Sequence, residues 1–427
     1  MSQDQVAKPE FTKSYVSAVE RDKARPSVKA LRLMAVRLGT TAAVLLTEPA
    51  DAPDGAAPEQ RAVAILDQAA LHLDQGEAWQ AAAVLDLGGW DLPALPEPLQ
   101  VRYLDLRSRA QLATGHGGAA HELLRAGLGR LAAADTRSLR ITLAATTAGY
   151  DPTGALAAYA ICQAELVADP TPNLELILRL AALQVAAYAH LHDDAGVLEV
   201  AETVLPLVGD GLPVERLAAL WPPSVGSPLG ADGPAAPRLT LYALSAVRSA
   251  AAMVLTVAAP AARRLPRSTS GTPAGYLRLA RLCLAGLRQE GLESRIDLEW
   301  AAIELDRAGG DLTAAEDSLN LAQVRLAAVA ARSPIRRPQL GADMARVHCL
   351  LGQLRERQGD PPAADECFRQ ALTEAQQSNP ATVRQVAQHY GDLLHRRGEA
   401  AAASTYYRLA LLPDTAPELG PSALAAE

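Results

Sequence analysis

The sequence predicts an all-α protein in which a small helical head precedes a long array of helical hairpins. Alanine, the strongest helix former, is abundant throughout the 427 residues. Apolar residues recur with the period of a helix from about residue 60 to residue 412. Small and aromatic residues also recur at a fixed offset of 39 residues, which is typical of helical-repeat proteins.

Composition divides the chain into four segments. They are, in chain order, a basic head at 1–46, a Pro- and Asp-rich linker at 47–59, a helical-repeat body at 60–412 and a flexible tail at 413–427. We expect no helix in the linker, because proline is poorly tolerated inside helices. The pattern of the body is irregular around 140–290, and a Gly- and Pro-rich insertion interrupts it at 209–238.

The head is basic although the chain is acidic. Residues 1–46 carry a charge of +4, whereas the whole chain carries -8. Helix signals are clear within it, because Thr12 is a suitable N-cap and Ser27 caps a second helix that runs through Leu38. Gly39 then fits a left-handed C-cap, and a short apolar helix is expected to follow it. A basic head on an acidic body suggests a surface that faces nucleic acid.

This pattern resembles the second half of a helix-turn-helix domain of the phage-repressor (Xre/Cro) type. The features that carry the resemblance are Thr12, Val16, Val19-Glu20, the basic loop that ends in Pro26-Ser27, and Leu38-Gly39. The resemblance implies that two groups of residues contact duplex DNA. Base edges would be faced by Thr12, Lys13, Ser14 and Ser17, and phosphates would be held by Arg21, Lys23 and Arg25.

The resemblance covers only the second part of the helix-turn-helix motif. Only Ser2 to Ala7 precede the turn before the recognition helix, so the first helix and most of the second are missing from the pattern. We therefore expect either a translation start upstream of Met1 or a remnant head. In both cases this chain should bind DNA weakly, because the second helix normally supports the recognition helix. The alternative is a basic helical hairpin that simply begins the array.

The body contains a repeated motif of small and aromatic residues. One copy recurs 39 residues later: Gly352, Gly359, Ala364, Phe368 and Ala371 become Gly391, Gly398, Ala403, Tyr407 and Ala410. We expect the small residues to allow two antiparallel helices to approach closely, the second glycine to begin the turn, and the aromatic residue to fill the space between the helices. The spacing resembles the tetratricopeptide repeat (TPR), with longer loops than its usual 34-residue unit. The pattern is clear at 61–88, 101–127, 296–322, 345–372 and 384–411. Degenerate helical hairpins are expected between 140 and 290.

The TPR resemblance implies a groove lined by the first helix of each hairpin, which would bind a peptide or a protein partner. The residues that this geometry places in the groove mix arginine with acids and amides, and Trp300 is the best aromatic anchor among them. They are Arg102, Asp105, Arg109, Asp297, Trp300, Glu304, Arg307, Arg346, Gln353, Gln388, Asp392 and His395. The alternative is that these residues form ordinary solvated helix faces.

The sequence lacks the patterns of the common catalytic sites. No lysine follows Lys29, which excludes both a phosphate-binding loop of the G-x-x-x-x-G-K type and a pyridoxal Schiff base from the body. The four cysteines form no Cys-x-x-Cys pair. His190 to Asp194 is interpreted as a polar helix end with its turn rather than as a metal site. We expect no enzymatic activity, no cofactor and no metal.

Two functions fit this organisation. The first is a bacterial transcriptional regulator with a DNA-binding head and a TPR-like body that binds an effector or a protein. The second is a TPR adaptor whose truncated head no longer binds DNA specifically. A reader of two half-sites would be a homodimer. We expect a cytoplasmic location without membrane contact, because the apolar stretch near Leu239 to Leu255 reads as a buried helix that carries Arg248.

Overall fold

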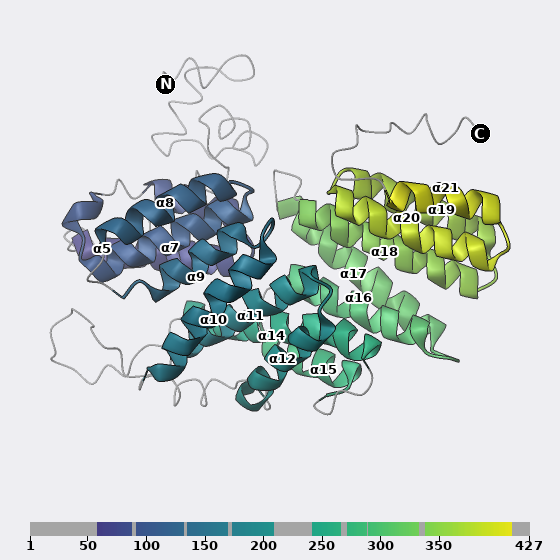
Figure 1. Cartoon of the computed structure of the whole chain (residues 1–427), viewed down its shortest axis with the longest axis horizontal. Coiled ribbons are helices and arrows are strands. Elements are labelled where there is room, and N and C mark those ends of the chain that lie inside the picture. The colour runs from purple at the N-terminus through teal and green to yellow at the C-terminus, as the bar shows by residue number, and fades with distance from the viewer. Residues whose placement is uncertain are drawn as a thin grey trace, which may run out of the picture. The chain divides into compact units, whose positions relative to one another are not determined.

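The computed structural model of the chain is all-α throughout the residues that it describes (Figure 1). These residues are 58–87, 91–131, 135–169, 173–208, 241–265, 271–287, 289–332 and 338–411. The predicted head, most of the linker, the insertion at 209–238 and the tail at 413–427 lie outside them. The expectations for the head therefore stay predictions. Helix α5 begins at Pro58, inside the segment predicted as linker, because proline is well tolerated at the first position of a helix.

Contacts divide the chain into two compact units. The first contains residues 1–191 and 213–247, and the second contains residues 192–212 and 248–427. The described helices of the first unit are α5 (Pro58–Asp74), α6 (Ala78–Leu87), η1 (Leu92–Ala94), α7 (Glu97–Ala113), α8 (Gly117–Arg130), α9 (Arg137–Thr147), α10 (Pro152–Ala168), α11 (Leu174–His190) and the start of α14 (Leu241–Arg264). Those of the second are α12 (Asp194–Val208), the rest of α14, α15 (Pro273–Leu284), α16 (Glu290–Asp306), α17 (Leu312–Arg332), α18 (Pro338–Arg357), α19 (Pro361–Gln376), α20 (Pro380–Arg396) and α21 (Ala400–Ala410).

Each unit stacks helical hairpins. In the first unit α5 packs on α6, α7 on α8 and α9 on α10, while the first helices α5, α7, α9 and α11 contact one another in turn. In the second unit the hairpins are α16–α17, α18–α19 and α20–α21, and the first helices α16, α18 and α20 again contact one another in turn. This pairing confirms the predicted stack of TPR-like hairpins. The first helices of each unit consequently share one layer.

Local signals explain where the hairpins begin and turn. Four helices start with a capping side chain followed by proline, as at Asp360-Pro361 and Asn379-Pro380. The Asn379 side chain accepts a hydrogen bond from the Thr382 N–H at 2.8 Å. The turns after α18 and α20 use Gly359 and Gly398, whose φ angles of 80° and 85° are unfavourable for residues with a Cβ. The repeated glycines therefore close the hairpins, as the sequence predicts.

The other repeated glycines allow close helix approach. A Cβ added to Gly352 would lie 2.6 Å from Phe368, and one added to Gly391 would lie 2.8 Å from Tyr407. Phe368 is fully buried and stacks on the Tyr390 ring, with centroids 4.8 Å apart. Glycine thus makes room for the aromatic ring of the partner helix in both copies. This confirms the role that the sequence assigns to the motif.

One turn differs from the predicted register. The repeat pattern aligns Gly310 with Gly359 and Gly398, but the left-handed residue after α16 is Gly309, with a φ of 71°. A Cβ on Gly310 would lie 1.9 Å from the carbonyl oxygen of Glu304, so Gly310 serves close backbone packing instead. Because two glycines are adjacent in this turn, the left-handed conformation falls on Gly309, one residue earlier than in the other two hairpins.

The apolar stretch expected to be a buried helix lies in α14. Among the described residues, Ser245–Arg264 is long and apolar enough to cross a membrane, but most of it is buried within the protein. Its start packs on the first unit, where the Ser245 hydroxyl donates a hydrogen bond to Asp74 of α5. Core helices of large helical proteins share this composition, because they are apolar on all sides.

Candidate partner-binding face

The predicted groove residues lie on first helices, except for Arg307, and form two separate groups. In the first unit α7 carries Arg102, Asp105 and Arg109. The second unit carries the rest, on α16 (Asp297, Trp300, Glu304), immediately after it (Arg307), on α18 (Arg346, Gln353) and on α20 (Gln388, Asp392, His395). We call the layer formed by α16, α18 and α20 the first-helix face of the second unit.

In the first unit Asp105 is buried in a bonded cluster rather than exposed. Only 6% of Asp105 is exposed, and its carboxylate accepts two hydrogen bonds of 2.8 Å from the Arg179 guanidinium. The Thr142 hydroxyl donates a third at 2.5 Å, and a nitrogen of Arg109 lies 3.7 Å away. Asp105, Thr142 and Arg179 stand 37 residues apart on α7, α9 and α11. The cluster therefore joins three successive first helices.

Electrostatics hold this carboxylate in its charged form. Burial alone would raise the pKa of Asp105, but the charge and hydrogen bonds of Arg179, helped by Arg109 and Thr142, outweigh burial and lower it. The other predicted residue of α7, Arg102, forms an ion pair with Asp67 of α5. All three predicted residues of this unit thus take part in contacts within the stack.

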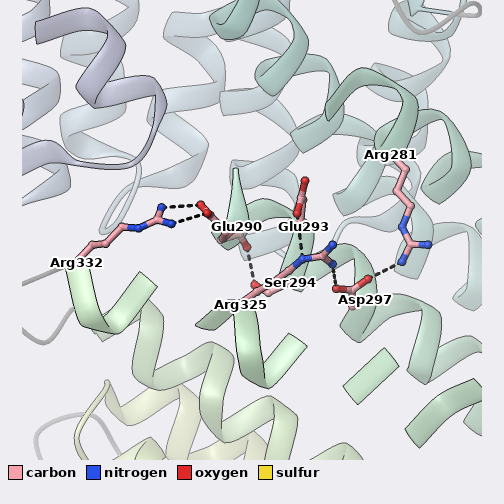
Figure 2. A network of polar contacts seen from close by, with 8 residues as sticks. Arg281, Glu290, Glu293, Ser294, Asp297, Arg325 and Arg332 are labelled. Carbon is pink, nitrogen blue, oxygen red and sulfur yellow. Dashed lines mark hydrogen bonds and ion pairs between the residues drawn. The ribbon is translucent and has the colours of Figure 1, made fainter. Parts of the chain in front are cut away.

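In the second unit Asp297 is the centre of a polar network (Figure 2). Its side chain is fully buried, with one oxygen bonded to Arg325 of α17 and the other to Arg281 of α15. Arg325 also contacts Glu293 at 3.0 Å, and Arg332 holds Glu290 at 2.7 Å. Burial raises the pKa of Asp297, and the two arginines only partly offset it. The network ties the hairpin α16–α17 to the preceding helix α15.

Trp300 lies one turn beyond Asp297 and is covered by the same arginine. The Arg281 guanidinium carbon is 6.0 Å from the centre of the Trp300 ring, which is the outer limit of a cation–π contact. The indole Nε1 is buried and has no hydrogen-bond partner among the described residues. Half of the Arg281 side chain remains exposed. The predicted aromatic anchor is therefore already in contact with a side chain of its own chain.

Two of the first helices share a charged position that the sequence analysis missed. Arg102 and Arg346 each stand 18 residues before the recurring buried alanine of their hairpin, and each binds a carboxylate on the preceding first helix. The carboxylate that Arg346 binds is Glu299, of which only 3% is exposed. The same position in α16 holds Asp297, so the sign of the charge is reversed there. Counting back from the alanines could have found this signal.

The last two hairpins leave more of the predicted residues accessible. Gln388 and His395 of α20 are exposed, and Gln353 of α18 is half-buried. Asp392 is half-buried and accepts a hydrogen bond from the Tyr407 hydroxyl at 2.8 Å. Glu304 is also half-buried, and Arg307 is exposed. A neighbour that the sequence analysis missed is His389, whose pKa is lowered by burial, so its imidazole is neutral near pH 7.

The segment around His192 forms the predicted polar turn. Helix α11 ends at His190 and α12 begins at Asp194, while the Asp193 carboxylate accepts a hydrogen bond of 3.0 Å from the Gly196 N–H. His192 adopts a φ of 56°, and Asp194 pairs with Arg264. Across the part of the chain that the structure describes, no three His, Cys, Asp or Glu side chains gather in a way that could hold a metal ion.

Comparisons with known proteins add little to this picture. No protein-family model matches the chain. No curated protein matches it at a significant level. One solved structure that it resembles is a tetratricopeptide repeat protein from Parabacteroides merdae, at 12% identity. That match covers 83% of this chain and 100% of the other, with a TM-score of 0.32. A similarity at this level carries no weight for function, and the assignment to TPR-like hairpins rests on the helix pairing described above.

Proposed function

We propose that this chain is a TPR-like scaffold that binds a protein or peptide partner on the first-helix face of its second unit and catalyses no reaction. The supporting observation is the contrast between helix α7 and the helices α18 and α20. The predicted residues of α7 are taken up by ion pairs, whereas α18 and α20 carry accessible amide and imidazole groups. Such groups can bond the backbone of a partner segment. A helical-repeat layer presents them over a long surface.

The test is partner capture with variants of this face. Replacing both Gln388 and His395 by alanine should reduce the amount of the main captured partner at least tenfold in a quantitative pull-down. The two side chains are exposed on α20, so their loss removes contacts without disturbing the core. The matched control replaces Ser404 and Arg408 on the second helix α21, which are also exposed. Equal losses in both variants would contradict the proposed face.

A second candidate function, transcriptional regulation, is favoured by the sequence of residues 1–46. Their charge of +4 and their resemblance to a repressor recognition helix support contacts with duplex DNA. In this proposal the scaffold senses an effector or a protein partner in the cytoplasm, and the head binds the promoter. The helical body is equally compatible with an adaptor that never binds DNA. DNA binding by residues 1–46 therefore distinguishes the two functions.

Salt dependence of DNA binding tests this candidate. The chain should bind duplex DNA weakly, and replacing Arg21, Lys23 and Arg25 by alanine should flatten the plot of log K against log salt concentration by about 3, since each phosphate contact contributes roughly 0.9. A gel-shift titration at two or more salt concentrations measures this slope. Replacing Arg125, Arg130 and Arg408 in the body is the matched control for lost charge. An unchanged slope in the head variant would contradict DNA binding by the head, and the adaptor function would then be the remaining proposal.

A further inference from the structure

Asp297, Trp300 and Arg281 form an arrangement that suits recognition of a foreign guanidinium group. The Asp297 carboxylate is fully buried, and its Oδ1 is bonded to Arg281. Its other oxygen is bonded to Arg325, which is also anchored by Glu293. Oδ1 is therefore bonded to a side chain of α15, outside the hairpin α16–α17, whereas the other oxygen is bonded within that hairpin. A buried carboxylate beside an aromatic face is a strong receptor for arginine.

Arg281 is well placed to leave this receptor. Its side chain is half exposed, whereas Arg325 is only 24% exposed. The helix that carries it stays packed without it, because Tyr276, Ala280 and Cys283 are buried on a different side of α15. Departure of the Arg281 side chain would open a path from solvent to Oδ1 and uncover the Trp300 ring. The arginine can thus swing into water while the backbone stays in place.

We propose that Asp297 and Trp300 form a receptor for an arginine side chain of the partner, and that Arg281 occupies this receptor in the unbound protein. This inference rests on the proposed function and specifies the chemistry of the partner segment. The partner's arginine replaces Arg281 in the same bond, so the buried carboxylate keeps a cationic partner throughout. The tethered Arg281 competes with every ligand. The apparent affinity for a ligand is therefore the intrinsic affinity multiplied by the fraction of time for which Arg281 leaves the receptor free.

The experiment removes the internal competitor and supplies a free one. The full chain with Arg281→Ala should bind Nα-acetyl-arginine amide saturably, at least tenfold more tightly than the unaltered chain does, as followed by calorimetry. The citrulline analogue has the same shape without the charge and should bind at least tenfold more weakly. Adding Asp297→Asn to Arg281→Ala should abolish the binding. Arg278→Ala, which removes an exposed arginine one turn earlier on α15, should create no binding.

Two outcomes would overturn the inference. One is equal binding of the arginine and citrulline compounds to the Arg281→Ala variant, and the other is binding that survives Asp297→Asn. Circular dichroism tests whether each variant is folded. If Arg281→Ala is unfolded, Arg281→Gln is used in its place. Failure of the proposed function is distinguishable: the arginine compound would still bind, but Gln388 and His395 would have no effect on partner capture.

Discussion

Replacing Asp105 by alanine should lower the free energy of unfolding of the first unit by about 3–5 kcal/mol, since removing one partner of a buried ion pair leaves the other charge uncompensated. Arg179 would lose both of its 2.8 Å bonds to the carboxylate, and only 14% of its side chain is exposed to water. Hydrogen exchange of peptides from α7, α9 and α11 measures the loss locally, which matters because two units need not unfold together.

Two controls separate the charge effect from general disturbance. Glu122→Ala changes an exposed acid on α8 and should alter stability by less than about 0.5 kcal/mol. The double variant Asp105→Ala with Arg179→Met removes both charges, and it should be more stable than Asp105→Ala alone because no buried charge is left unpaired. If the double variant were less stable than the single one, the contribution of Asp105 would come from packing.

The same cluster gives the stability a defined pH dependence. The folded-state pKa of Asp105 lies below its unfolded value, so the stabilisation is present above about pH 4 and is lost as the pH falls through the lower folded value. The stability difference between the unaltered chain and Asp105→Asn should therefore shrink in acid. Denaturation at pH 7 and pH 3 measures it. A difference that grows on acidification would mean that the pKa is raised instead.

Replacing Phe368 by alanine should cost the second unit about 3–5 kcal/mol, the usual loss for a fully buried aromatic ring. Gly352→Leu should cost about 1–3 kcal/mol by itself, because its Cβ alone would lie 2.6 Å from the Phe368 ring. The two changes act on the same space between α18 and α19. Combined, the leucine fills part of the cavity, so the double variant should lose less than the sum of the single losses.

Chemical denaturation of the four proteins completes this cycle, and we expect a coupling of about 0.5–3 kcal/mol in the favourable direction. Ser404→Ala, at an exposed position of α21, serves as a distant partner that should show no coupling with Phe368→Ala. Strict additivity of Gly352→Leu and Phe368→Ala would contradict the contact between the glycine and the ring.

The hairpins were predictable because local chemistry specifies them. Proline after a capping side chain begins α19 and α20, and the left-handed Gly359 and Gly398 end α18 and α20. The pairing of Gly352 with Phe368 was also predictable, since a repeated small residue and a repeated aromatic residue have one compact arrangement. Between 140 and 290 a capping side chain followed by proline still begins α10 and α15, but the repeated pair of glycine and aromatic residue is not clear. The sequence there supports helices but leaves most of their bounds undetermined.

The polar partners of the site residues were not predictable, because they come from distant parts of the chain. Asp105 meets Arg179, which is 74 residues away, and the meeting depends on how the first helices α7, α9 and α11 stack. Nothing in the local sequence indicates that Arg281 will reach Asp297 and Trp300. Helix faces that read as solvated from their charges can therefore be buried by neighbouring helices. Whether α16, α18 and α20 bind a partner stays a prediction.

The bond between Arg179 and Asp105 has a consequence for how the first unit unfolds. Arrays of this kind are usually described by nearest-neighbour terms, in which a terminal repeat can fray without disturbing the one beyond its neighbour. Here a side chain of α11 is bonded to α7, two first helices earlier in the stack. Fraying of α11 would also remove the counter-charge of α7. The helices α7, α9 and α11 should consequently open as a single foldon, with one shared exchange rate rather than a gradient along the chain.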